Sequence, residues 1–357
     1  MKRLLWQVIK WSVGVGLIGA IVWFNRDEFA RALSGSADWE LQPLLVAGLL
    51  CLIGVLLTFY RWYVLVRALD LPFRAVDASR LGFGGFFFSI VLPGSIGGDL
   101  VKAGFLAREQ RRRTVAVSTI ILDRLVGLYG LVLLAALVGA FYWQQAWAAP
   151  QLRVLLVFIW VTAGSILAVV LLVPVLPLSA DRFIDRLQRR KRFGRIGGIL
   201  CELARALQMY RHRGRHLALA TALAVVGHVG FVLSFYFTAL AVPGKTPPLG
   251  VHYLIIPVGM VVQAIPITPG NIGVAEGVYN ELYKLADPGL RDTVKGVLVT
   301  LAQRLIYLGV AFIGLACYLP LRKTVRQVMA EERMEPSPNG RLAEAADPAK
   351  VNACDRA

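Results

Sequence analysis

The hydrophobic residues of the chain are gathered in long blocks, and short polar or charged stretches separate one block from the next. A helix of about 20 apolar residues crosses the roughly 30 Å hydrocarbon core of a membrane. The pattern therefore predicts an all-α integral membrane protein in which six blocks form full spanning helices. The predicted spanning blocks are residues 4–24, 44–60, 114–142, 152–176, 217–241 and 294–319.

The composition supports the membrane class and excludes a soluble domain. Hydrophobic residues make up 57% of the chain, charged residues make up 17%, and the mean hydropathy is +0.62. A soluble domain of this size could not bury that much apolar surface. Lys2 and Arg3 precede the first block as they would in a signal peptide, but residues 4–24 lack a small-x-small cleavage site. We therefore expect an uncleaved first span.

The positive charge of the chain agrees with membrane topology rather than with nucleic-acid binding. The net charge is +17, and the basic residues lie between apolar blocks with no aromatic or zinc-binding arrangement around them. Cytoplasmic loops of membrane proteins carry an excess of Lys and Arg. We expect no nucleic-acid partner for this reason. No metal or cofactor is expected either, because the four cysteines are far apart and form no CxxC pair.

Loop charges predict on which side of the membrane each loop lies. Residues 25–43 are mostly acidic and are expected outside, whereas residues 61–80, with Arg61 counted as a loop residue, are basic and are expected in the cytoplasm. The stretch that begins at Lys102 is also basic, and residues 177–216 carry 11 basic and 3 acidic side chains. The positive-inside rule then predicts cytoplasmic N- and C-termini in a bacterial-type inner membrane.

Two apolar segments, residues 81–98 and 251–286, do not fit simple spans. The loops on both sides of the first segment are basic, and those on both sides of the second are expected outside. Each segment must therefore enter and leave the membrane at one face. Each also contains Pro and Gly residues that break a helix. Since irregular backbone is not tolerated in lipid, we expect two re-entrant hairpins whose breaks are buried in protein or line a wet cavity.

The two breaks share a sequence pattern, P-G-x-I-G followed by a carboxylate. The carboxylate is Asp99 in the first pattern and Glu276 in the second, and an Arg-Leu pair follows farther along, at Arg124 and at Arg304. Because the two segments enter from opposite faces, the pattern predicts an inverted repeat around a site at the middle of the membrane. The turn positions of the two patterns are Pro93, Gly94, Gly97, Pro269, Gly270 and Gly273.

Arg124 and Arg304 each lie about ten residues inside a spanning block, near the bilayer centre. An arginine there costs at least about 2.5–3.5 kcal/mol and needs an interior partner. Asp123 is displaced from Arg124 by about 100° around the helix, so Asp99 and Glu276 are the expected partners. These pairs are either static salt bridges or part of a site in which the arginines bind a crossing phosphate through bidentate contacts. Amide groups of the glycine-rich breaks would add to the affinity for an anion.

The domain organisation follows from the same pattern. Residues 1–320 form a polytopic membrane domain, and residues 321–357 are a mixed-charge tail expected to be disordered in the cytoplasm. Within residues 177–216, apolar residues recur at helical spacing among arginines. This loop is either an amphipathic helix on the cytoplasmic leaflet or an ordinary linker.

The segments FFFSIVLPGSIGGDLVKAGFL, DRLVGL and IPITPGNIGVAEGVY resemble the lysylphosphatidylglycerol synthase transmembrane-region family, the flippase-like domain family, over roughly residues 5–320. The resemblance implies a membrane domain that translocates lipids, sometimes ahead of a cytoplasmic aminoacyl-transfer domain. The chain ends soon after its last predicted span, so lysyl transfer is not expected. The positions that match the motifs are Pro93, Gly94, Gly97, Asp99, Asp123, Arg124, Pro269, Gly270, Gly273, Glu276 and Arg304, and Asn271 joins them as a candidate binding residue.

Three functions are compatible with these features. The favoured one is the binding and transbilayer movement of an anionic phospholipid or polyprenyl-type lipid, without an ATPase because the chain has no GxxxxGK[ST] motif. An enzyme acting on a lipid phosphate would need a general base or metal ligands near the arginines, and we expect no catalytic residues. The remaining alternative is a scaffold that recruits a lipid- or glycan-synthesis enzyme. Candidate protein partners are therefore such an enzyme and a second copy of the chain.

Overall fold

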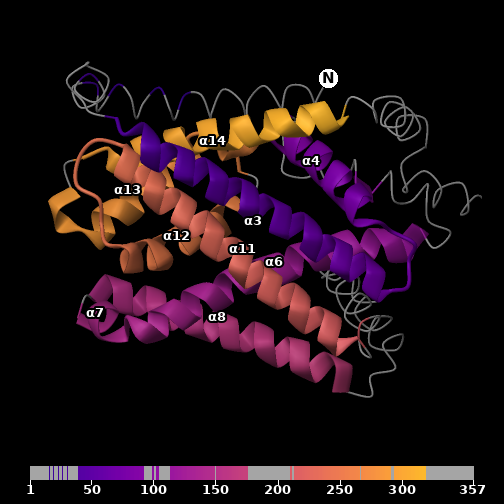
Figure 1. The fold of residues 1–357 in the computed structure, drawn as a ribbon. Helices are drawn as coiled ribbons and strands as arrows, with labels where there is room; N and C mark the ends of the chain where they lie inside the picture. Colours follow the sequence, from indigo (N-terminus) through magenta and orange to yellow (C-terminus); the bar gives the residue numbers. More distant parts are fainter. Residues whose placement is uncertain are drawn as a thin grey trace, which may run out of the picture.

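The computed structural model describes residues 39–91, 113–148, 150–175, 213–265, 267–290 and 293–318, together with nine separate residues: Gly16, Gly19, Trp23, Arg26, Ala30, Asp99, Lys102, Ala103 and Tyr210. Within this part of the chain all regular structure is helical (Figure 1). All but three residues of the predicted first span, nearly all of the basic loop and the whole predicted tail lie outside the described residues. So do Pro93, Gly94 and Gly97.

Nine α-helices and two 3-10 turns are described, and their long apolar stretches form the body of the molecule. In chain order they are α3 (Leu41–Ala68), α4 (Ala75–Val91), α6 (Arg113–Phe141), α7 (Trp143–Ala148), α8 (Pro150–Val175), α11 (Gly214–Ala241), α12 (Leu249–Gln263), η2 (Pro269–Asn271), α13 (Val274–Ala286), η3 (Pro288–Leu290) and α14 (Lys295–Tyr318).

Four stretches of the described residues are long and apolar enough to cross a membrane: Leu41–Ala68, Ser118–Phe141, Gly214–Ala241 and Lys295–Ile313. They belong to α3, α6, α11 and α14, and each overlaps one of the predicted blocks. This confirms an all-α, multi-pass membrane protein. The six-span count stays a prediction, because most of residues 4–24 lie outside the described part and α8 contributes only the shorter apolar helix Leu156–Ala168.

The predicted end of the second span was wrong. Residues 44–60 were expected to span, but α3 continues without a break to Ala68, and Arg61 lies two turns inside the helix with only 5% of its surface exposed. The surrounding sequence is apolar and aromatic, so nothing in it ends the helix. Arg61 is therefore an interior residue rather than a loop residue.

The helices α3 and α11 pack side by side in antiparallel directions (Figure 1). The Glu40 amide at the start of α3 donates a hydrogen bond to the Ala241 carbonyl at the end of α11, over 3.2 Å. At the crossing, a Cβ added to Gly54 would lie 3.2 Å from the Gly227 carbonyl oxygen. Such small residues let two membrane helices approach closely, and van der Waals packing then holds them together.

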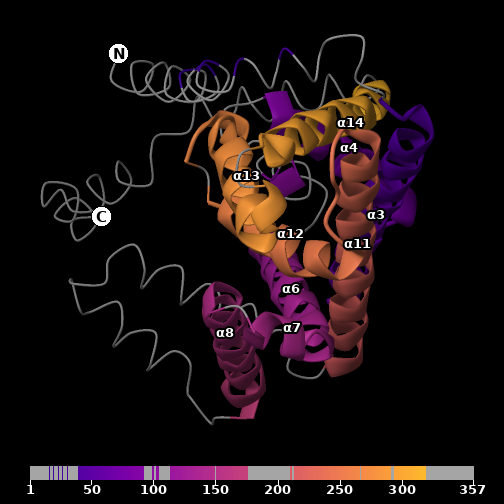
Figure 2. The ribbon, with the colours of Figure 1, turned by 90° about the vertical axis from the view of Figure 1, so that its left-hand side faces the viewer.

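The other long helices pack around this pair. The helix α4 lies on α14, and α12 lies on α6, while α13 packs against both α12 and α14. The largest buried apolar cluster joins α11, α12, α13 and α14 to α6. Figure 2 shows α8 at the edge of the bundle, where it contacts α6 and α7. The break between α12 and α13 thus lies beside the long apolar helices of the bundle.

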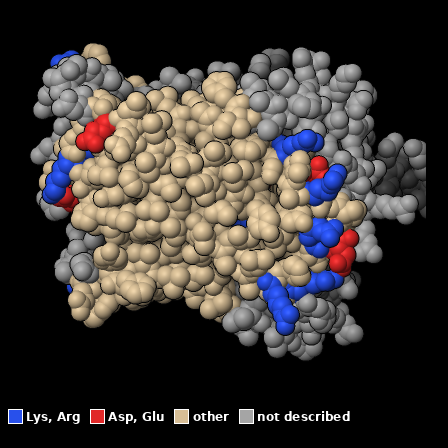
Figure 3. All heavy atoms as spheres, in the orientation of Figure 1, with Lys and Arg blue, Asp and Glu red and all other residues tan. Residues whose placement is uncertain are grey.

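On the face of the molecule that Figure 3 shows, charged side chains gather at the two ends of the bundle and leave a broad middle band almost without charge. One end, where α3 stops and α11 starts, is rich in arginine. Its charged residues are Arg67, Asp70, Arg74, Asp77, Arg80, Arg213 and Arg215. The opposite end is mixed in charge and includes an ion pair between Lys245 and Asp287 with a separation of 2.7 Å. The arginine-rich end is the one that the loop charges predict to be cytoplasmic.

Candidate functional site

The second break is a short irregular segment between α12 and α13, at the residues that the sequence pattern predicted. The chain leaves α12 at Gln263, turns through η2 and enters α13 at Val274. Gly270 and Gly273 have φ angles of 60° and 80°, in the left-handed region that glycine adopts without a steric penalty. The two glycines of the P-G-x-I-G pattern are therefore needed for the turn itself.

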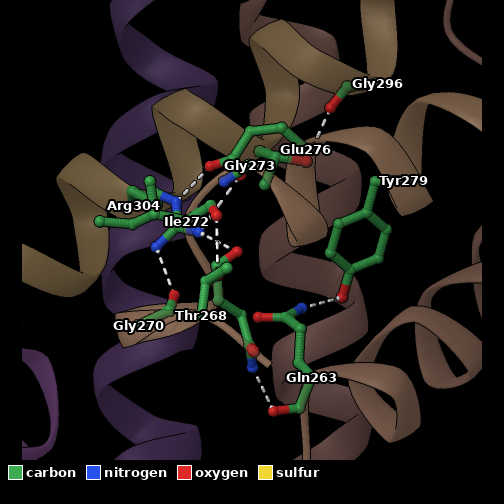
Figure 4. Close-up of polar contacts among 11 residues, drawn as sticks. Gln263, Thr268, Gly270, Ile272, Gly273, Glu276, Tyr279, Gly296 and Arg304 are labelled. Carbon is green, nitrogen blue, oxygen red and sulfur yellow. Dashed lines mark hydrogen bonds and ion pairs between the residues drawn. The ribbon is translucent and has the colours of Figure 1, made fainter. Parts of the chain in front are cut away.

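Side chains replace the helical hydrogen bonds that the break lacks (Figure 4). The Asn271 side chain accepts a bond from the Ile267 amide over 3.2 Å and donates one to the Gln263 carbonyl. The Thr268 hydroxyl donates to the Ile272 carbonyl over 2.8 Å. Since buried backbone groups without partners are costly, these bonds make the break stable inside an apolar bundle. Thr268, Gln263 and Asn271 thus hold the break together through these hydrogen bonds.

Glu276 connects the break to α14. Its side chain has no exposed surface, and Oε2 accepts a hydrogen bond from the Gly273 amide over 2.7 Å at the start of α13. The other oxygen, Oε1, pairs with Nε of Arg304, and a second contact joins Arg304 Nη2 to Oε2 over 3.3 Å. The prediction that Glu276 is the partner of Arg304 is confirmed. The negative charge at the first turn of α13 also suits the positive end of the helix dipole.

Arg304 makes further bonds to the backbone of the break (Figure 4). Nη1 donates to the Gly270 carbonyl over 2.9 Å, and Nη2 donates to the Asn271 carbonyl over 3.0 Å. An arginine has five N–H donors, so the contacts to Glu276, Gly270 and Asn271 account for four of them. The guanidinium is therefore bound to both the carboxylate and the carbonyl oxygens of the break.

The first half of the chain has the same type of ion pair. Arg124 of α6 pairs through Nε with Asp99, which lies just beyond the first break. The Arg124 side chain is 47% exposed, compared with 26% for Arg304. The prediction that Asp99 is the partner of Arg124 is confirmed. Of the two interior arginines, Arg124 is the more accessible.

Asp123 pairs with Arg61 of α3 rather than with its neighbour Arg124. The Asp123 carboxylate accepts bonds from Arg61 Nε over 2.8 Å and from Nη2 over 3.2 Å. Both side chains are nearly inaccessible, with 11% and 6% exposure. Asp123 was a candidate binding residue on sequence grounds, and the structure places it in a two-bond ion pair between α3 and α6.

Lys102 is a second interior cation that the loop assignment missed. Its Nζ lies 5.2 Å from the centre of the Trp62 ring and 5.8 Å from that of Phe59. It is also close enough to interact electrostatically with both ion pairs of this half, Asp99–Arg124 and Asp123–Arg61. A sequence signal was available, because Lys102 follows Asp99 by three residues and therefore shares its helical face.

We call these five residues the first cluster: Arg61, Asp99, Lys102, Asp123 and Arg124. The second cluster consists of Gly270, Asn271, Gly273, Glu276 and Arg304.

The residue that precedes the interior arginine differs in charge between the two halves. Asp123 precedes Arg124, whereas Gln303 precedes Arg304. Gln303 is 1% exposed, and its side chain donates to the Ser234 hydroxyl over 3.0 Å and accepts from the Thr238 hydroxyl over 2.8 Å. Both contacts are to α11, just as Asp123 contacts α3. In the second half, the neutral hydrogen bonds of Gln303 thus take the place of the Asp123–Arg61 ion pair in the first half.

His228 of α11 makes a helix–helix contact, because its Nε2 lies 2.9 Å from the Gly127 carbonyl oxygen of α6. In the described part of the chain, no group of three or more His, Cys, Asp or Glu residues is arranged to hold a metal ion.

Comparison with known proteins gives one family. The sequence model of the family described as "Lysylphosphatidylglycerol synthase TM region" matches residues 8–314. Comparisons with curated proteins and with solved structures each gave no significant match. The matched segment contains both P-G-x-I-G patterns and both clusters.

Proposed function

We propose, on the premise that the chain belongs to the lysylphosphatidylglycerol synthase TM region family, that this protein binds an anionic lipid or lipid-linked substrate and moves it across the membrane. The single observation that carries the proposal is the pair of interior arginines, Arg124 and Arg304, each bound to a carboxylate beside a helix break. The family indicates a membrane function related to lipids, and the charges indicate what part of the lipid is bound.

An inverted repeat explains the arrangement of the helices. We assign α3, α4 and α6 to one half and α11, α12 and α14 to the other. In this assignment α3 is equivalent to α11, α4 to α12 and α6 to α14. The antiparallel contact of α3 with α11 then joins two equivalent helices, and the contact of α4 with α14 is equivalent to that of α12 with α6. The shared P-G-x-I-G pattern and the two acid–arginine pairs support the same correspondence. Inverted repeats of this kind place a transporter's substrate site at the repeat interface near the membrane midplane.

Re-entrant hairpins fit the lengths of the helices beside the second break. The helix α12 has 15 residues and α13 has 13, so each rises only about 20 Å, which is less than the roughly 30 Å of hydrocarbon. The proposal is that α12 and α13 enter and leave at the external face, and that α4 begins the matching hairpin at the cytoplasmic face. Both termini are then cytoplasmic in a bacterial-type inner membrane, as the arginine-rich end of the bundle favours.

The chemistry of the arginines suits a phosphate group. A guanidinium stays charged when it is removed from water and binds phosphate oxygens through two parallel bonds. Asp99 and Glu276 satisfy the two guanidinium groups in the absence of substrate. A phosphate that replaces one carboxylate would exchange one charge-assisted contact for another, so the polar headgroup could cross without an isolated charge in lipid.

A leaflet-exchange assay tests the proposal. The purified protein is reconstituted in phosphatidylcholine vesicles that contain phosphatidylglycerol carrying a fluorescent nitrobenzoxadiazole label, and dithionite is added outside. Dithionite quenches only the outer leaflet unless the labelled lipid exchanges. We expect quenching to proceed beyond the outer-leaflet fraction with wild-type protein, and to stop there with the double variant Arg124→Gln, Arg304→Gln.

The surface control is Arg80→Gln, because Arg80 is exposed at the arginine-rich end and takes no part in either cluster. We expect this variant to exchange lipid as the wild type does. Well-folded wild-type protein that moves neither labelled phosphatidylglycerol nor a labelled polyprenyl phosphate would refute translocation. The scaffold would then be the better hypothesis, and co-purification of a lipid- or glycan-synthesis enzyme would be its test.

A further inference from the structure

The two clusters differ in how much positive charge they hold. Among the described residues, the first cluster has three cationic side chains (Arg61, Lys102 and Arg124) and two carboxylates (Asp99 and Asp123). The second cluster has one arginine and one glutamate. By formal charge, the first cluster therefore carries +1 and the second carries zero.

We propose that the first cluster is the loading site for the anionic group, with Lys102 and Arg124 as the two side chains that contact it. This inference rests on the proposed function and deepens it, because it names which half binds first and adds Lys102 to the site. An uncompensated positive charge in a low-dielectric interior is costly, and a bound anion removes that cost. The ligand chemistry is a phosphate oxyanion.

The other charges of the first cluster have a different role. Arg61 and Asp123 neutralise one another through two hydrogen bonds, and both are almost fully buried. They tie α3 to α6 and position the cluster. Arg124, in contrast, is half exposed, and the ammonium group of Lys102 lies against the faces of two aromatic rings. A cation held by rings rather than by its own carboxylate retains N–H donors for a ligand.

The second cluster is closed to an anion in this state. Arg304 is engaged by Glu276 and by the carbonyls of Gly270 and Asn271. The fully buried Glu276 oxygens would also repel a phosphate. Gln303, the residue before Arg304, is neutral and adds no positive charge. An anion could enter here only after the break moves away from α14. The second cluster is thus the release or transfer site rather than the first contact.

The position of the first cluster indicates the side from which the anion arrives. Arg61 lies seven residues, or about 10 Å of helix, before Ala68 at the arginine-rich end of α3. Arg67 and Arg74 are exposed at that end. Their field attracts an anionic headgroup toward the cluster. Loading therefore takes place from the arginine-rich end of the bundle.

A binding experiment on the full chain tests the inference. Purified protein in a neutral detergent is titrated with palmitoyl-oleoyl phosphatidylglycerol, with the phosphatidylcholine of the same chains, and separately with inorganic phosphate, and bound lipid is counted by native mass spectrometry. Lys102→Gln and Arg124→Gln should each weaken phosphatidylglycerol binding by about tenfold to a hundredfold, the range for loss of one hydrogen-bonded charge. Lys102→Arg should retain binding. Competition by inorganic phosphate would identify the phosphate group alone as sufficient, whereas no competition would assign the binding to a lipid headgroup.

The comparison variants separate the inference from the proposed function. The double variant Glu276→Gln, Arg304→Gln removes the second ion pair without changing the net charge, and it should weaken phosphatidylglycerol binding less than Lys102→Gln or Arg124→Gln does. Arg80→Gln, outside both clusters, should bind phosphatidylglycerol as the wild type does. If Glu276→Gln, Arg304→Gln loses binding while Lys102→Gln and Arg124→Gln retain it, the loading site lies in the other half. That result overturns the inference but leaves the proposed translocation standing. If wild-type protein shows no preference for phosphatidylglycerol over phosphatidylcholine, both fail. A melting curve for each variant identifies any that is unfolded, and Lys102→Arg keeps the test decisive if Lys102→Gln is unfolded.

Discussion

The carboxylate of Glu276 should be one of the most costly side chains to remove from this protein. It is fully buried, accepts the Gly273 amide and pairs with Arg304. Glu276→Ala leaves a partly buried guanidinium without its counter-charge, for which breaking a buried pair costs about 3–5 kcal/mol. It also leaves the Gly273 amide without its acceptor, a loss of about 1–3 kcal/mol. The two terms overlap, so we expect a total loss of about 4 kcal/mol in the free energy of unfolding.

A matched control lies on the same helix. Glu281 is 73% exposed and pairs with Lys284 over 3.2 Å at i,i+3 spacing. Such a surface pair contributes about 0–1 kcal/mol, so Glu281→Ala should change stability by no more than that. The assay is unfolding in mixed micelles with increasing denaturing detergent, followed by tryptophan fluorescence, with the two variants compared under identical conditions.

The double variant Glu276→Ala, Arg304→Ala provides the sharper test. Because it removes both charges, it should be less destabilised than Glu276→Ala alone, despite having one more truncated side chain. Equal stability of Glu276→Ala and Glu281→Ala would refute the reasoning. A double variant less stable than Glu276→Ala by the full cost of Arg304→Ala would also contradict it, since that result means the two side chains act independently.

Three further predictions concern other parts of the bundle. Arg61→Met should destabilise the fold by about 3–5 kcal/mol, whereas Arg61→Met with Asp123→Leu should recover most of this loss, and detergent unfolding of the two variants measures the difference. Gly296→Ala should lower the free energy of unfolding by about 1–3 kcal/mol, because the new Cβ would lie 2.5 Å from the backbone of α13. Gly277→Ala should be neutral or stabilising, because nothing lies within 4 Å of its Cβ position. The melting temperatures of the two variants check this. Hydrogen bonding to Lys245 lowers the pKa of Asp287 from the ordinary 3.8. This ion pair should therefore stabilise the fold above about pH 4 and lose that effect as the pH falls further. Melting curves of Asp287→Asn should show a smaller dependence on pH in this range.

The interior arginines illustrate how much of the site was predictable. Arg124 and Arg304 stand out because a charge in the middle of a long apolar block must be buried or pair with something. The shared P-G-x-I-G pattern then indicates Asp99 and Glu276 as the partners, and the structure confirms both pairs. The bonds from Arg304 to the carbonyls of the break could not be predicted, because they depend on the path of the backbone.

Arg61 and Lys102 illustrate the opposite case. Both lie near the ends of apolar blocks, where the positive-inside rule counts every Lys and Arg as a loop charge. That rule uses distance along the sequence and has no information about burial. Only the packing of α3 against α6 shows that Arg61 faces Asp123, and only the approach of residue 102 to α3 places its ammonium group over the rings of Phe59 and Trp62.

From the amino-acid sequence alone one can predict the membrane class, the four described spans, the position of the second break and the two acid–arginine pairs. These properties depend on hydrophobic length, on Pro and Gly geometry, and on the cost of burying a charge, all of which are local. The tertiary structure decided the difference between the two clusters, because the net charge of a site depends on which side chains from distant helices meet there. The close contact of α3 with α11, at Gly54 and Gly227, is also visible only in the tertiary structure, because it depends on how two separate helix surfaces fit together.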